Sequence, residues 1–158
     1  MPNTLINVSN RLPVTVEEDR ITKSSGGLVA ALEGLPEGQY KTKWIGWPGT
    51  AFPEESRRQE IARKLAEEHG CVAVFLSQEE VTAFYEGFSN SSIWPLLHYL
   101  PNYLRYEPAW WQHYQNVNRT FAEKVLETVH EGDLVWVHDY QLMLLPTMLR
   151  AAAPNLKI

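Results

Sequence analysis

Four short apolar runs recur along the chain, and a stretch with helical spacing separates each run from the next. The runs occupy residues 5–9, 43–47, 71–76 and 134–137. Strands buried on both faces of a parallel sheet have this continuous apolar character, and helices make the connections between them. The alternation therefore predicts an α/β fold with a Rossmann-like, doubly wound parallel sheet.

Start and stop signals place the remaining elements between these strands. Helices are predicted over residues 27–32, 54–68, 77–87, 108–132 and 142–152, and a loop or hairpin over 14–22 with its turn at 18–19. Ser77 and Glu80 have the spacing of a capping box, and Gly87 is expected to end that helix. Pro146 must either kink the last helix or mark its true start. Residues 156–158 resemble the beginning of a further strand, which indicates a fragment.

Length and charge limit the class of protein. The chain has 158 residues, enough for one compact core, so a single domain is expected over 1–158. The formal net charge of −5 argues against a nucleic-acid partner, which would require a basic stripe. No apolar run has the length of a membrane span, and the apolar start is too short for a signal peptide. The single cysteine, Cys71, excludes an internal disulfide and fits a reducing compartment such as the cytoplasm.

Residues with unusual chemistry follow the predicted strands. They occupy positions 9–11, 47–49, 77 and 138–140. The carboxyl ends of parallel strands meet at one edge of the sheet, where open α/β folds bind their ligands. Arg11 offers a planar fork of donors that suits a phosphate, and the alternative is an ordinary surface or salt-bridged arginine. This edge is a candidate anion and sugar-phosphate site.

Two further features at this edge each have a functional and a structural interpretation. Gly26 and Gly27 would let backbone amides approach a phosphate at a helix N-terminus, but the pair could equally form a plain tight turn. Its spacing matches neither the dinucleotide fingerprint nor the P-loop. Asp139 could accept hydrogen bonds from sugar hydroxyls or act as a base, or it could cap the helix that follows.

Aromatic residues are numerous, with six tryptophans and seven tyrosines. Such rings suit a core and also a pocket that stacks on sugar faces. Strand alternation places Trp44 in the core and Trp47 at the rim of the site. Around Tyr85 and Trp94, glycine, serine and asparagine are so dense that a binding loop is favoured over plain packing. No cluster has metal-ligand spacing and no nucleophile–base pair is present, so neither a metal nor another cofactor is expected.

Taken together, several motifs resemble the N-terminal part of the trehalose-6-phosphate synthase family, retaining glycosyltransferases of the two-lobed GT-B type. The matching stretches are SNRLPV at 9–14, SGGL at 25–28, WIGWPG at 44–49, FYEGFSNSSIWPLLHY at 84–99, VNRTFA at 117–122 and GDLVWVHDYQLMLLPTMLR at 132–150. They cover nearly the whole chain in the expected order. The resemblance implies that this chain is the acceptor-side N-terminal lobe of a GT-B fold, incomplete without a C-terminal donor-binding lobe.

The resemblance also implies a reaction, the transfer of glucose from UDP-glucose to glucose 6-phosphate, and an acceptor site. By matching positions, Arg11 would bind the acceptor phosphate with help from Tyr85. Trp47, Trp94 and Asp139 would line the acceptor sugar, and Asp139 is the residue assigned to catalysis. Such enzymes are thought to work by front-face displacement, in which the leaving phosphate helps to deprotonate the acceptor.

On the donor side, the resemblance places Gly27, with Gly26 beside it, against the diphosphate of the nucleotide sugar. Most other donor contacts would come from the lobe that follows position 158. One departure is Gln141, which stands where the family usually has histidine; glutamine keeps hydrogen-bonding capacity but cannot carry a proton charge near neutral pH.

Three functions follow from these expectations. The first is the acceptor half of the glucosyltransferase, an enzyme as a complete protein and inactive as a fragment alone. The second keeps the fold but changes the acceptor, as in glucosylglycerol-phosphate synthases. The third is a non-catalytic sugar-phosphate-binding or regulatory module, which the length of the chain and Gln141 support. The sequence leaves homo-oligomerisation open.

Overall fold

A four-stranded parallel sheet forms the centre of the protein. The computed structural model describes residues 4–17, 20–24, 27–33 and 41–158. The strands are β1 (Thr4–Arg11), β4 (Lys41–Trp47), β5 (Cys71–Ala73) and β6 (Leu134–Val137), in the order β5-β4-β1-β6. All three neighbouring pairs are parallel. Because the order runs outward from β1 in both directions, the sheet is doubly wound, as the sequence predicts.

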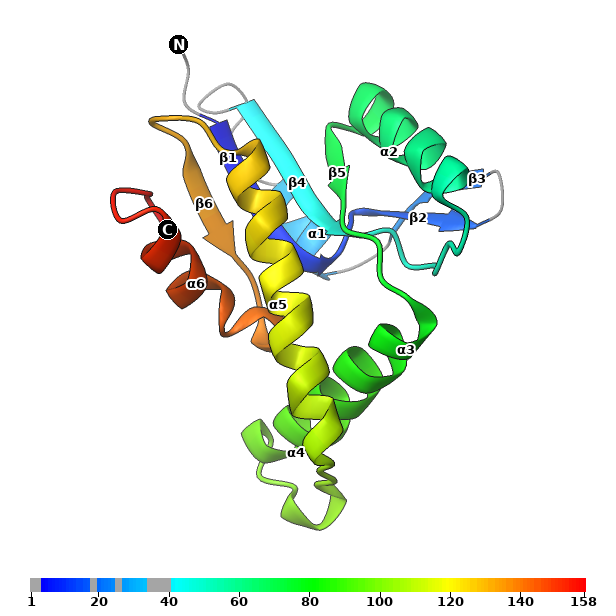
Figure 1. Cartoon of the computed structure of the whole chain (residues 1–158), viewed down its shortest axis with the longest axis vertical. Helices are drawn as coiled ribbons and strands as arrows, with labels where there is room; N and C mark the ends of the chain where they lie inside the picture. The colour runs from blue at the N-terminus through cyan, green and yellow to red at the C-terminus, as the bar shows by residue number, and fades with distance from the viewer. Residues whose placement is uncertain (1–3, 18–19, 25–26, 34–40) are drawn as a thin grey trace.

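Helices cover both faces of this sheet (Figure 1). On one face, Ile61 and Leu65 of α2 (Glu55–His69) pack with Cys71 and Ala73. The other face is covered by α5 (Pro108–Thr128) and α6 (Leu145–Ala152). There, Val117 and Phe121 are fully buried with Ile6 and Val8. Burying each large apolar side chain contributes about 1.5–3 kcal/mol. This buried cluster therefore fixes the position of β1 relative to the helices.

A separate hairpin lies beside the carboxyl edge of the sheet. It consists of β2 (Val14–Glu17) and β3 (Arg20–Lys23), which pair antiparallel; the predicted turn at 18–19 lies outside the described residues. The Val16 amide donates to the Pro48 carbonyl at 3.1 Å, which ties the hairpin to the end of β4. Helix α1 (Gly27–Glu33) follows and lies behind the sheet in Figure 1, opposite α5.

The segment after β5 differs from the prediction. β5 ends at Ala73, not at residue 76, and the capping box of Ser77 and Glu80 forms as predicted. The helix does not end at Gly87. It continues from α3 (Gln78–Glu80) through a π-helix, η1 (Val81–Ile93), into α4 (Trp94–Leu97), so the residues around Tyr85 and Trp94 are helical and not a loop.

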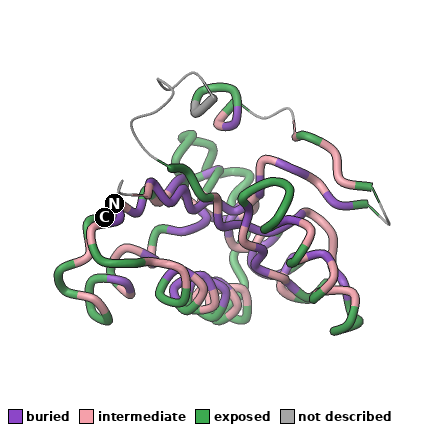
Figure 2. Tube along the Cα trace, turned by 90° about the horizontal axis from the view of Figure 1, so that it is seen from above, coloured by how far each residue is buried: buried purple, intermediate pink, exposed green. Residues whose placement is uncertain are grey.

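The physical reason for Gly87 is a close contact between two helices. A Cβ atom at this position would lie 2.7 Å from the indole ring of Trp110 on α5. The glycine therefore permits η1 and α5 to approach, and it does not act as a stop signal. Figure 2 shows the inner faces of the helices and the strands as buried, with the exposed residues on the outside.

The C-terminal part shows smaller differences. α5 ends at Thr128, short of Gly132. Two short 3₁₀ turns, η2 (Pro101–Tyr103) and η3 (Tyr140–Leu142), precede α5 and α6 respectively. Pro146 lies in the first turn of α6, so it marks the start of that helix and introduces no kink. Residues 156–158 contribute a single parallel bridge, from Lys157 to Leu134. None of the helices in the described residues has the length and apolar character needed to cross a membrane.

Candidate functional site

A pocket of about 180 Å³ lies at the carboxyl edge of the sheet. Among the described residues, five parts of the chain line it: the end of β1 with Arg11, Ser24 together with the first turn of α1, β4 with Trp44, η1 with Tyr85, and the segment after β6 with Asp139. Strand ends that are far apart in sequence thus meet here, as the parallel topology requires. Ser77, also expected at this edge, is exposed at its capping box and is not among the described residues that line the pocket.

Arg11 is fixed at this edge by contacts that leave part of its guanidinium unsatisfied. Its Cζ lies 4.9 Å from the centre of the Trp47 ring, a cation–π contact, and Nη2 donates to Thr15 Oγ1 at 3.2 Å. Nε is buried and has no hydrogen-bond partner among the described residues, and the same is true of Asn10 Oδ1. Buried polar groups are nearly always paired, so an unpaired guanidinium donor beside a pocket indicates a site for an anion.

Two small residues support the position of Arg11, Gly49 by leaving space and Ser9 by hydrogen bonds. Neither role is evident from the sequence. Gly49 has φ +96°, and a Cβ there would lie 2.3 Å from Arg11 Nη2. Ser9 Oγ donates to the Arg11 carbonyl at 2.7 Å and accepts from Trp44 Nε1 at 2.6 Å. The WIGWPG motif therefore shapes the space around Arg11 as well as supplying rings.

The two tryptophans of that motif have exchanged their predicted places. Trp47 is 4% exposed and belongs to the core, while Trp44 is only half-buried and lines the pocket. Trp47 and Ile45 point to the face covered by α5 and η1, and the Trp47 ring meets Tyr85 edge-on at 6.2 Å. Trp47 thus supports Arg11 and Tyr85 from within the core and is not at the rim.

Asp139 caps the turn that follows it, as one of its two interpretations predicts, and it also lines the pocket. Its Oδ1 accepts from the Tyr140 amide at 2.8 Å, which caps η3, and the exposed side chain also lines the pocket. Its φ of 72° is left-handed, a conformation that costs a non-glycine residue about 1–3 kcal/mol and is concentrated at functional sites. The neighbouring His138 is buried, and burial lowers the pKa of its imidazole, opposed by the Asp139 charge.

Trp94 and Gly27 are not among the described residues that line the pocket. Trp94 is 40% exposed at the start of α4 and stacks on His98 with ring centres 4.0 Å apart, and it does not line the pocket. Gly26 lies outside the described residues. Gly27 begins α1, and a Cβ there would meet open space. The pocket therefore collects Arg11, Tyr85 and Asp139, with Trp47 behind them.

The electrostatics of the pocket are simple. Among the described residues that line it, Arg11 is the cation and Asp139 the anion. A phosphate would find one cationic contact, and a hydroxyl-bearing group could donate to the carboxylate. Gln141, which was singled out in the sequence, is buried in the pocket wall.

Comparison with known proteins identifies the family to which this chain belongs. The model of glycosyltransferase family 20 matches residues 3–158. The chain is 48% identical over 160 residues to an alpha,alpha-trehalose-phosphate synthase [UDP-forming] of Yarrowia lipolytica, covering 98% of this chain and 34% of that protein. The chain belongs to glycosyltransferase family 20, and it spans about a third of the length of the curated relatives it matches.

Solved structures give the same result. The Burkholderia xenovorans trehalose-phosphate synthase in complex with glucose-6-phosphate superposes with a TM-score of 0.74 at 26% identity, over 98% of this chain and 32% of that one. The E. coli enzyme bound with UDP-2-fluoro glucose gives a TM-score of 0.73 at 25% identity, over 96% of this chain and 31% of that one. The parallel sheet with flanking helices is therefore the fold of this part of these glycosyltransferases.

Proposed function

We propose that this chain is the acceptor-binding lobe of a retaining glucosyltransferase that makes trehalose 6-phosphate from UDP-glucose and glucose 6-phosphate. The proposal depends mainly on the Arg11 guanidinium. It lies on the Trp47 ring, Arg11 lines the pocket, and its buried Nε has no hydrogen-bond partner among the described residues. A phosphate monoester satisfies that donor through charge-assisted hydrogen bonds. The glucose-6-phosphate complex of a relative with the same fold supports this ligand.

The sugar of the acceptor would extend from Arg11 toward Asp139. The Asp139 carboxylate keeps one oxygen beyond the one that caps η3, and this oxygen can accept a hydrogen bond from a sugar hydroxyl. Tyr85 lies between the Trp47 ring and the pocket and can contact the phosphate or the sugar. Trp94 would close the sugar site only if α4 moves or another part of the protein brings it in.

The donor would bind across the mouth of the pocket. In the transfer, the bond from C1 of glucose to the UDP oxygen breaks while C1 bonds to the acceptor hydroxyl oxygen on the same face. The acceptor proton passes to the departing phosphate. Asp139 would orient the acceptor hydroxyls, and Gly26 and Gly27 would lie against the diphosphate. Since Arg11 is the cation among the described lining residues, further cations for the diphosphate would come from a second lobe.

We also place the protein in the cytoplasm. Cys71 is a free, buried thiol, and burial raises its pKa to about 11. An unreactive thiol of this kind fits a reducing compartment. This function would involve two protein partners. One is the second lobe, and the other is a further copy of the chain in a homo-oligomer.

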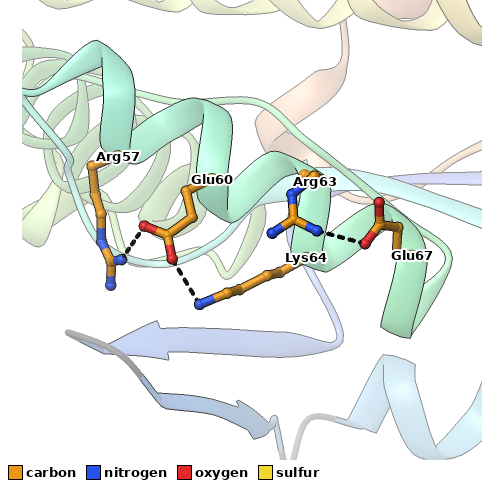
Figure 3. A network of polar contacts seen from close by, with 5 residues as sticks. All are labelled: Arg57, Glu60, Arg63, Lys64 and Glu67. Atoms are coloured by element: carbon orange, nitrogen blue, oxygen red, sulfur yellow. Dashed lines mark hydrogen bonds and ion pairs between the residues drawn. The ribbon is translucent and has the colours of Figure 1, made fainter.

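Calorimetric titration of the chain tests the proposal. Glucose 6-phosphate should bind, and Arg11→Ala should weaken binding by about 1.5–3 kcal/mol, the contribution of a charged hydrogen bond. Arg63→Ala is the matched control, because Arg63 lies on the exposed side of α2 in an ion pair with Glu67 (Figure 3). The control should bind glucose 6-phosphate as the unmodified chain does.

Two other ligands distinguish the alternative functions. Tighter binding of glycerol 3-phosphate than of glucose 6-phosphate would favour the glucosylglycerol-phosphate reaction. Tight binding of UDP-glucose by this chain would contradict a donor site in a second lobe. If the chain binds no phosphate ester, or if Arg11→Ala binds as tightly as the control, the proposed function is wrong.

A further inference from the structure

The segment that carries Asp139 has little regular structure of its own. It connects β6 to α6 through the single turn η3. Asp139, the residue just before that turn, has the left-handed φ of 72°. A short connection in a strained conformation keeps one geometry only where the surroundings determine it. The contacts that hold residues 139–143 therefore decide where the Asp139 carboxylate lies.

The first contact comes from Tyr114 on α5. Its hydroxyl donates to the Tyr140 carbonyl at 2.7 Å and accepts from the Met143 amide at 3.1 Å. Tyr114 is 1% exposed, so water does not compete for these bonds. Burial raises the pKa of this phenol to about 12, so the hydroxyl keeps its proton and its donor role at neutral pH. One buried hydroxyl thus joins both ends of the turn.

Asn118, one helical turn further along α5, supplies the second contact. Its Nδ2 donates to the Gln141 carbonyl at 3.1 Å and to the Tyr114 carbonyl at 2.9 Å. Asn118 is fully buried, and its neighbours Val117 and Phe121 on the helix are apolar core residues. A polar side chain in such a place is costly unless its hydrogen bonds are made, which argues for a specific task.

A third contact reaches the segment from η1. The Tyr140 hydroxyl donates to Asn90 Oδ1 on η1 at 2.9 Å. Tyr85, five residues earlier on the same π-helix, lines the pocket with Asp139. The walls of the pocket on η1 and after β6 are therefore joined by this hydrogen bond, between residues that do not themselves line the pocket.

We propose that Tyr114 and Asn118 are positioning residues that set the place of Asp139 for the acceptor sugar, an inference that rests on the proposed function. Neither residue is among the described residues that line the pocket. Both act on the backbone at Tyr140, Gln141 and Met143, directly after Asp139. Arg11, on β1, is held by Thr15 and Trp47 and not by these two residues, so its contact with a phosphate is expected to survive their substitution.

The test compares Tyr114→Phe with Tyr103→Phe, which removes a hydroxyl from a tyrosine that is 71% exposed. By calorimetry, Tyr114→Phe should weaken glucose 6-phosphate binding by about tenfold, the effect of a buried hydrogen bond. It should leave the affinity for inorganic phosphate unchanged, because the Arg11 guanidinium is held by Thr15 and Trp47 and not by Tyr114. Tyr103→Phe should change neither affinity.

A double-mutant cycle with Asp139→Asn shows whether the effect passes through Asp139. In the Asp139→Asn background, Tyr114→Phe should change the affinity for glucose 6-phosphate by less than about twofold, because coupled residues are not additive. Asn118→Leu provides a second variant if Tyr114→Phe fails to fold. It has a similar shape and also removes Asn118 Oδ1, which has no partner among the described residues.

The possible results are distinct. Two results would overturn the positioning role while leaving the proposed function intact. In the first, Tyr114→Phe weakens glucose 6-phosphate binding equally with Asp139 present and in the Asp139→Asn background. In the second, it weakens inorganic phosphate binding as much as glucose 6-phosphate binding. If the unmodified chain binds inorganic phosphate but shows no gain for glucose 6-phosphate, the proposed function fails, and this inference fails with it.

Discussion

The outer face of α2 and the pocket edge use arginine in opposite ways. On α2, Arg57 and Lys64 both pair with Glu60, at 2.6 and 2.8 Å, and Arg63 pairs with Glu67 at 2.9 Å (Figure 3). These pairs are local, three or four residues apart, and at least partly exposed to solvent, so each contributes little to stability. Arg11 is held by a ring and a hydroxyl from other elements and keeps a buried donor unpaired.

This difference distinguishes a charged side chain on the protein surface from one that is available to bind a ligand. Arg57, Arg63 and Lys64 pair with carboxylates of their own helix, and the pKa of Glu60 is lowered by hydrogen bonds from Lys64 and Arg57. The Arg11 guanidinium has been oriented by folding but not neutralised by a carboxylate in the described residues. Such preorganisation reduces the entropy lost when a ligand binds.

The comparison predicts its largest effect at Gly49. Gly49→Ala places a Cβ against the Arg11 guanidinium in a left-handed backbone conformation. The guanidinium must move, so glucose 6-phosphate affinity should fall by about tenfold or more, with a stability loss of about 1–3 kcal/mol. Calorimetry and urea unfolding measure the two effects.

Gly27→Ala is the matched control for that change, because its Cβ would meet open space. It should leave glucose 6-phosphate binding unchanged and should not lower the free energy of unfolding. If Gly49→Ala behaved like Gly27→Ala, the close fit around Arg11 would have no role in binding.

A smaller effect is expected from the pH dependence of stability. Burial lowers the pKa of His138 in the folded state. As pH falls below about 6.5, the unfolded chain takes up a proton that the folded chain excludes. The free energy of unfolding should then fall with pH, by at most about 1.4 kcal/mol per pH unit for this group.

Urea unfolding between pH 7 and pH 5 measures that slope. His138→Asn should reduce it, whereas His69→Asn, at the exposed end of α2, should not. If the free energy of unfolding of His138→Asn fell with pH as steeply as that of the unmodified chain, folding would not exclude a proton from His138.

The smallest effect is predicted on α2. Glu60→Gln removes the shared partner of Arg57 and Lys64, both partly exposed to solvent. We expect a slight fall in the urea midpoint that disappears in roughly 1 M salt, where surface ion pairs are screened. Glucose 6-phosphate binding should stay unchanged; a loss of binding would mean that α2 and the pocket are not independent.

The sequence predicts the sheet and the core of the site because both follow from local patterns. The apolar runs define the strands, and topology alone then places Arg11 and Asp139 at one edge. The failures come from long-range packing. Gly87 is a contact point for Trp110 on another helix, and nothing near it in sequence indicates this.

The same reason explains the two tryptophans and Trp94. Alternation correctly separates Trp44 from Trp47, but which of them is buried depends on where η1 packs. Trp94 follows a π-helix, whose wider turn changes the direction that later side chains face relative to an α-helix. A local pattern does not carry that information.

The central claim is that the Arg11 guanidinium, whose Nε has no hydrogen-bond partner among the described residues, binds a phosphate. The most direct measurement is the ¹H–¹⁵N resonance of Arg11 Nε, assigned through its loss in Arg11→Lys, during titration with glucose 6-phosphate and with glucose. The account predicts a saturable downfield shift with glucose 6-phosphate and none with glucose. A resonance that stays in place while glucose 6-phosphate binds would contradict it.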